Sequence, residues 1–212
     1  MPPRGWRAAP PACPGGPCGP ERRLNEALLV STGVVALGEI GDKTQLLALL
    51  LAARYRRPWP IVAGILVATL ANHAVAGALG AWITRLVDPQ WMRWLLGLSF
   101  IAVALWMLVP DHVEADDRPA SGRLGVFGVT TIAFFLAEMG DKTQVATVML
   151  AARYDALVAV VAGTTLGMML ANVPAVLLGE QAVKVMPVAW VHRIAAVVFA
   201  AIGVAVLAGF GG

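Results

Sequence analysis

The chain has 212 residues, of which 58% are hydrophobic and 14% are charged, with a formal net charge of +3. A water-soluble domain carries roughly 25% charged residues, and the mean hydropathy of this chain is +0.74. The apolar residues fall in long blocks with basic residues at their ends. These features exclude an ordinary soluble domain and indicate an integral membrane protein. The small net charge gives no reason to expect a nucleic-acid partner.

Residues 1–23 are rich in Pro, Gly and Arg and contain no continuous apolar stretch. A signal peptide needs such a stretch, so we predict a disordered tail instead. The two cysteines of the chain, Cys13 and Cys18, both lie in it. A lone C-x4-C pair in a flexible tail is weak evidence for a metal site, and we expect no functional role for it.

Six apolar segments follow the tail, separated by short breaks that carry proline or charge. Each is long enough to cross a hydrocarbon core of ~30 Å, which takes about 20 helical residues. A membrane β-barrel would need short segments of alternating polarity, which do not occur here. We therefore predict an all-α integral membrane protein with six transmembrane helices, at residues 25–53, 59–84, 91–109, 124–152, 156–180 and 187–210.

The chain aligns with itself when it is shifted by 99 residues. The stretch LGEIGDKTQ at 37–45 returns as LAEMGDKTQ at 136–144, and twelve of the twenty positions in 36–55 are identical to their partners. The alignment continues through the later segments of each half. It matches Gly64 with Gly163, Asn72 with Asn172 after one inserted residue, Trp91 with Trp190, and Phe100 with Phe199.

Each copy of the repeat holds three predicted spans. Because three is odd, the second copy enters the membrane from the opposite side, which makes the halves inverted repeats, as in many secondary transporters. We assign 24–109 to the first repeat, 110–123 to an acidic central loop and 124–212 to the second repeat. The motifs lie near the middle of the first and fourth spans, at the depth where transporters of this kind bind substrate.

The repeated motif places charges in an apolar region. On a continuous helix its two acids and its lysine would share a sector of about 100°, and the six charges of both copies would cost ~15–20 kcal/mol if they faced lipid. One interpretation is structural, with Glu39 paired to Lys43 and Glu138 to Lys142, but this leaves one acid per motif unpaired. The other is a cation and proton site. Its predicted ligands are Glu39, Asp42, Glu138 and Asp141.

Carboxylates favour hard divalent ions such as Mn²⁺, Ca²⁺ or Mg²⁺, and neither motif contains Cys or His, which argues against Zn²⁺ and Cu⁺. Crowded carboxylates also hold protons, which an arriving cation would displace. Such competition is a simple basis for exchange. The glycines of the motif either break the helix or allow close helix packing. The residues assigned supporting roles are Lys43, Thr44, Gln45, Lys142, Thr143, Gln144, Asn72 and Asn172.

Two further polar residues, His73 and Glu180, lie outside the repeated motif. His73 has no partner in the repeat and is interpreted as a hydrogen-bonded packing residue, with a proton relay as the alternative. Glu180 is expected at a membrane interface.

The doubled E-x-G-D-K-T motif resembles that of the GDT family, the transmembrane protein 165 family of Ca²⁺/Mn²⁺:H⁺ antiporters, and the resemblance covers residues 25–210. It implies exchange of Mn²⁺ or Ca²⁺ for protons, with Glu39, Asp42, Glu138 and Asp141 along the pathway. It also implies manganese export from the cytoplasm across a bacterial plasma membrane. The lysines and arginines weakly favour an orientation with both termini outside and the central loop in the cytoplasm.

Two other function classes remain open from the residues. One is an exporter of small organic cations or amino acids, which would be indifferent to divalent metals. The other is a scaffold or an intramembrane acid–base enzyme, although neither explains why the whole motif is duplicated. We expect a transporter and not an enzyme, with a divalent cation as substrate, the lipid bilayer as surroundings and no cofactor beyond the transported ions. The sequence makes no prediction of oligomeric state.

Overall fold

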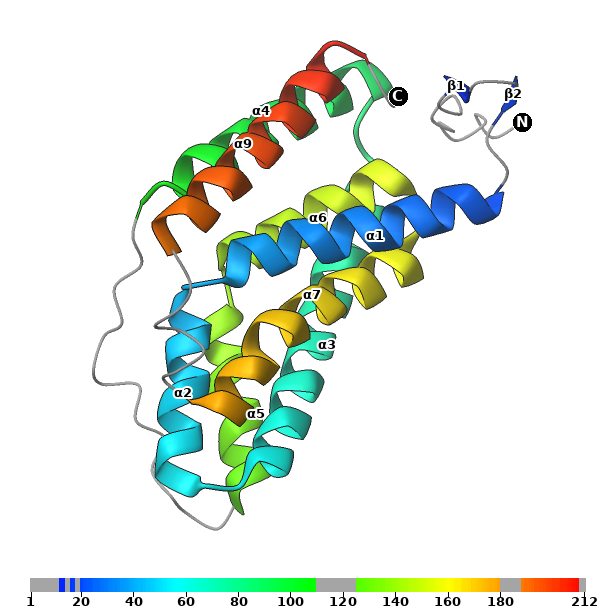
Figure 1. Ribbon diagram of the computed structural model, residues 1–212. Helices are drawn as coiled ribbons and strands as arrows, with labels where there is room; N and C mark the ends of the chain where they lie inside the picture. The colour runs from blue at the N-terminus through cyan, green and yellow to red at the C-terminus, as the bar shows by residue number, and fades with distance from the viewer. Residues whose placement is uncertain (1–11, 14–15, 18–19, 110–124, 180–187, 210–212) are drawn as a thin grey trace.

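The computed structural model describes residues 12–13, 16–17, 20–109, 125–179 and 188–209. Strands β1 (Ala12–Cys13) and β2 (Gly16–Pro17) form a small antiparallel hairpin. Most of the rest of the described chain is helical and forms eight helices (Figure 1). They are α1 (Pro20–Glu39), α2 (Lys43–Tyr55), α3 (Pro58–Ile83), α4 (Pro89–Trp106), α5 (Gly125–Glu138), α6 (Lys142–Tyr154), α7 (Leu157–Leu178) and α9 (Val188–Leu207). The predicted central loop at 110–123, Glu180 and Cys18 lie outside the described residues.

The helices follow the apolar segments, with one correction. As far as they are described, the segments at 59–84, 91–109, 156–180 and 187–210 each contain a single helix: α3, α4, α7 and α9. The segments at 25–53 and 124–152, each predicted as one transmembrane span, are divided into two helices at the motif, which is one of the two alternatives left open for the motif glycines. Helix α1 begins at Pro20, inside the range assigned to the tail.

Three of these helices are long and apolar enough to cross a membrane, as far as the chain is described. They are Pro58–Ile83, Leu157–Leu178 and the part of α9 from Trp190 to Leu207. Helix α5 is a shorter apolar helix. Many large apolar side chains are exposed, among them Trp91 and Trp190, which are 71% and 63% exposed near the start of α4 and α9. Exposed tryptophans at helix ends are typical of the boundary between lipid and water.

The two halves pack in matching ways. Helix α1 lies along α7, and its counterpart α5 lies along α3 (Figure 1). A Cβ placed on Gly163 would lie 2.5 Å from the carbonyl oxygen of Leu28 on α1, and one on Gly64 would lie 3.0 Å from that of Phe127 on α5. Glycine is therefore needed at both crossings, because any side chain would meet backbone.

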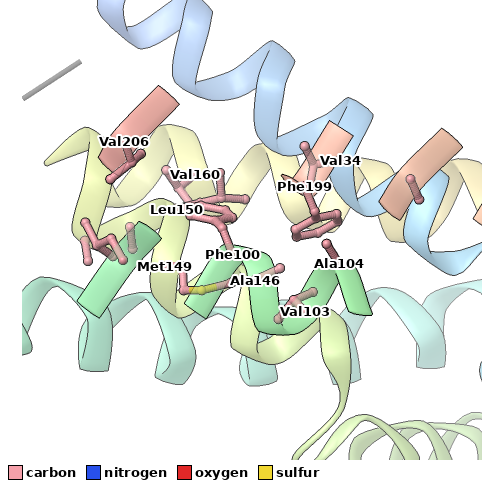
Figure 2. Close-up of a cluster of buried hydrophobic side chains, with 14 of the residues drawn as sticks. Val34, Phe100, Val103, Ala104, Ala146, Met149, Leu150, Val160, Phe199 and Val206 are labelled. Carbon is pink, nitrogen blue, oxygen red and sulfur yellow. The ribbon is translucent and has the colours of Figure 1, made fainter. Parts of the chain in front are cut away.

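Two apolar clusters fill the interior. In the first, α4 and α9 pack on each other and on α1 and α6, as Figure 2 shows for Phe100, Phe199, Val34 and Leu150. The second joins α2, α3, α5 and α7 around Leu51, Ile65 and Phe134. The motifs lie at the ends of α1 and α5, in the region where the helices of both clusters meet.

Candidate cation site

Each motif interrupts a helix at the same point. Gly41 and Gly140 have φ values of 83° and 79°, which glycine adopts without the penalty that a Cβ imposes. Asp42 and Asp141 follow in extended conformation (ψ 169° and 166°) and precede the first residues of α2 and α6. The backbone N–H of each aspartate donates to the carbonyl of the glutamate three residues earlier, at 3.1 Å in both motifs. The sequence Gly-Asp therefore ends one helix and starts the next.

In each helix break, a glutamine side chain accepts a hydrogen bond from the backbone of the glycine. The backbone N–H of Gly41 donates to Oε1 of Gln45 at 2.9 Å, and that of Gly140 donates to Oε1 of Gln144 at 2.7 Å. Both alternatives for the motif glycines hold, at different positions. Gly41 and Gly140 break the helix, whereas Gly38 lies within α1 and admits the side chain of Met107, whose Cε would be 2.8 Å from an added Cβ.

Glu39 and Glu138 are the last residues of α1 and α5, and both are fully buried. Each carboxylate accepts a hydrogen bond on Oε2 from the threonine hydroxyl of its own motif: Thr44 at 2.7 Å and Thr143 at 3.1 Å. Within the described ranges the other oxygen, Oε1, accepts no hydrogen bond in either residue. A buried carboxylate oxygen without a donor is costly, which favours a ligand that the protein itself does not supply.

Three of the four predicted acidic ligands converge. Glu39, Glu138 and Asp141 are buried, and each offers one oxygen within 4.8 Å of the others. Divalent cations bind oxygen at about 2.0–2.6 Å, so two oxygens on opposite sides of one ion stand at most ~5 Å apart. The cluster therefore has the dimensions and the donor type of a site for a hard divalent ion. It combines both halves of the chain.

The lysines of the motifs cross between the halves. Nζ of Lys43 lies 3.1 Å from Oδ1 of Asp141, and Nζ of Lys142 lies 3.9 Å from Oδ1 of Asp42. Among the ion pairs of the described residues, neither lysine is paired with the glutamate of its own motif, as the structural interpretation would require. The helix break separates residues that one helical face would have joined. Asp42 is buried beside Lys142 and does not belong to the group of three.

The remaining supporting residues lie on helices around the cluster. Nε2 of Gln45 donates to the Ala171 carbonyl at 3.0 Å and thereby ties α2 to α7. Nδ2 of Asn72 donates to the Phe135 carbonyl on α5 at 3.0 Å. Asn172 instead donates within its own helix, to the backbone and sulfur of Met168. The paired asparagines thus make unlike contacts.

One histidine differs from its prediction, and a second makes a contact that was not predicted. His73 is fully buried, but neither ring nitrogen has a hydrogen-bond partner in the part of the chain that is described, so the expected hydrogen-bonded packing role is wrong in that respect. His192 was not predicted. Its Nε2 donates to the carbonyl of Ile40 in the first helix break at 2.8 Å. Because the repeat places Arg93 at the position equivalent to His192, no pattern could have indicated this contact.

A buried acidic cluster between two matching helix breaks, in a chain with membrane-length apolar helices, defines a membrane transporter for cations. The comparisons with known proteins give the family. Residues 27–115 and 126–210 match the family described as Divalent cation/proton antiporter GDT1, and the chain belongs to it.

The relatives agree with this assignment. A Vibrio cholerae protein named "Putative manganese exporter" is 48% identical over 184 residues, which cover 86% of this chain and 90% of that protein. A GDT1-like protein of Synechocystis is 30% identical over 167 residues, covering 69% and 80% of the two chains. GDT1-like protein 3 of Oryza sativa is 26% identical over 170 residues, covering 68% of this chain and 60% of the rice protein. No solved structure matches the chain.

Proposed function

We propose that this protein exchanges a divalent cation, Mn²⁺ or alternatively Ca²⁺, for protons, and that Glu39, Glu138 and Asp141 hold the ion. The observation that carries the proposal is the convergence of three buried carboxylates from both halves within 4.8 Å. Oxygen donors alone suit hard ions of this class. Asp42, paired with Lys142, is assigned to the same pathway beside the group of three.

Proton exchange follows from the charge of the cluster. Three carboxylates and the nearby ammonium of Lys43 leave a net negative charge when no metal is bound. Carrying that charge through a membrane is expensive, so protons are the simplest replacement for the departed ion. The metal and the protons then compete for the same oxygens, and this competition couples their movement.

The proposed architecture is six spans in two inverted repeats, with each bent helix pair, α1–α2 and α5–α6, counted as one span. Matching helix breaks and matching crossings at Gly64 and Gly163 support it. An inverted repeat provides alternating access by rocking one half against the other around a fixed site. The name of the Vibrio cholerae relative supports manganese as the transported ion and export as the direction. We assign this export to the bacterial plasma membrane.

The test is transport in liposomes with an imposed pH gradient. Mn²⁺ flux, Ca²⁺ flux and the accompanying proton flux are measured for the wild type and for the Glu39→Gln and Glu138→Gln variants. We expect metal flux that dissipates the pH gradient and is lost in both variants. Flux that persists in both folded variants, or that leaves the pH gradient intact, would disprove the proposal and favour an organic-cation exporter or a scaffold.

A further inference from the structure

Asp141 takes part in two interactions that oppose each other once a metal is bound: an ion pair with Lys43 and the proposed metal site. One of its oxygens lies 3.1 Å from the ammonium of Lys43. The same residue belongs to the group of three carboxylates that can hold a cation. An ammonium and a divalent ion that share one carboxylate repel each other strongly in a poorly solvated site. Binding of the metal therefore disfavours the position that Lys43 occupies in this structure.

The two lysines are not equivalent in their freedom to move. The side chain of Lys43 is 31% exposed, whereas that of Lys142 is 2% exposed. Lys142 also donates to the carbonyl of Val109 at 3.5 Å, beyond the end of α4. Lys43 can turn its flexible stem outward without breaking a packed contact of that kind, since long lysine side chains readily place the charge at a wetter surface.

We propose that Lys43 is a tethered competitor of the transported cation: its ammonium holds Asp141 while the metal is absent and swings outward when the metal binds. This inference rests on the proposed function, because it requires the group of three to be the metal site. Lys142 has no such role, since its partner Asp42 stands outside the group and its side chain is enclosed.

The competitor has two consequences for transport. It weakens equilibrium binding, because the metal must displace an ammonium from one of its ligands. Once the metal has left, the ammonium of Lys43 also offsets part of the negative charge of the metal-free site. This lowers the cost of releasing the metal and of returning the metal-free site across the membrane. Removal of the charge should therefore tighten binding and slow net transport. Exchange of metal for metal, which never requires the empty site to return, should continue.

The experiment measures Mn²⁺ binding to the purified full-length protein, and both net Mn²⁺ flux and Mn²⁺/Mn²⁺ exchange in liposomes. For Lys43→Gln we expect the dissociation constant to fall about tenfold, the change that follows from loss of one close charge pair. Net flux at saturating Mn²⁺ should fall several-fold while exchange is retained. Lys142→Gln removes the same charge from the other motif and should not tighten binding.

A chemical rescue separates charge from folding. In a background with Cys13→Ser and Cys18→Ser, Lys43→Cys should bind Mn²⁺ tightly until an aminoethyl disulfide adduct restores the ammonium and the wild-type dissociation constant. A methyl adduct should not restore it. Lys43→Arg, which keeps the charge, should bind no more tightly than wild type.

The failures are distinguishable. A wild-type protein that neither binds nor moves Mn²⁺ overturns the proposed function and this inference together. A functioning wild type whose Lys43→Gln variant has an unchanged or larger dissociation constant, or loses exchange and net flux to the same extent, overturns this inference alone.

Discussion

Phe100 of α4 packs against Phe199 of α9, with ring centroids 6.1 Å apart and planes inclined at 43°. The two residues are also partners in the repeat, since they stand 99 positions apart in the chain. A residue that contacts its own repeat partner lies where equivalent positions of the two halves meet. Both rings are buried, so α4 and α9 form a joint between the halves (Figure 2).

Replacement of either ring should weaken that joint. We expect Phe100→Ala and Phe199→Ala each to destabilise the protein by about 3 kcal/mol, a usual cost of removing a buried phenylalanine. The double variant should lose less than the sum by ~0.5–1.5 kcal/mol, because the contact between the rings can be lost only once. Unfolding in detergent measures all three. Leu98→Ala on the exposed side of α4 is the control, and full additivity would contradict a direct coupling of the rings.

The helix break should be sensitive to backbone strain alone. A Cβ on Gly140 meets no atom within 4 Å, yet its φ is 79°. We therefore expect Gly140→Ala to cost ~1–2 kcal/mol through the left-handed conformation. Gly33→Ala is the matched control: its Cβ also meets nothing, but Gly33 lies in α1, where alanine should stabilise by roughly 0.5–1 kcal/mol. Equal effects of the two substitutions on the unfolding temperature would show that the break does not impose the strain.

Much of the helical scaffold was predictable because long apolar segments can be located directly in the sequence. Apolar blocks located α3, α4, α7 and α9, and the repeat named Phe100 and Phe199 as equivalents. The breaks were harder to predict, because an apolar block does not reveal that Gly41 will adopt a positive φ. The sequence could state only that the motif glycines break the helix or permit packing.

The sequence could single out the acids of the two motifs but not their pairing. Spacing within one motif favours a contact between Glu39 and Lys43, because residues four apart are neighbours on a continuous helix. The break removes that geometry and directs Lys43 to Asp141 of the other motif. Contacts without a repeat partner, such as His192 with Ile40, follow from tertiary packing and have no signature in the sequence.

The threonines should matter through their hydrogen bonds to the glutamates. Thr44→Val leaves Oε2 of Glu39 buried without its donor, which costs roughly 1–3 kcal/mol. We expect a lower unfolding temperature and lost Mn²⁺ transport, with partial recovery in Thr44→Ser. Thr32→Val is the control, because the Thr32 hydroxyl bonds only to the Leu28 carbonyl of its own helix. If both valine variants behave alike, the bond to Glu39 has no special role.

Asp141 and Asp42 should differ in what they contribute. Asp141→Asn removes a negative charge from the group of three and should weaken Mn²⁺ binding at least tenfold, because carboxylate charge dominates affinity for hard cations. Asp42→Asn should instead remove a buried carboxylate that lies 3.9 Å from the ammonium of Lys142, and loss of one partner of a buried pair lowers stability by about 3–5 kcal/mol.

Two measurements on the same samples separate these effects: the Mn²⁺ dissociation constant and the unfolding temperature with and without Mn²⁺. An ion that binds only the folded protein raises the free energy of unfolding by RT ln(1 + [L]/Kd), so the unfolding temperature rises with the Mn²⁺ concentration. We expect Asp42→Asn to unfold at a lower temperature yet to gain stability from Mn²⁺, and Asp141→Asn to gain much less at the same Mn²⁺ concentration. The reverse result would move the metal to Asp42 and assign Asp141 to the ion pair with Lys43.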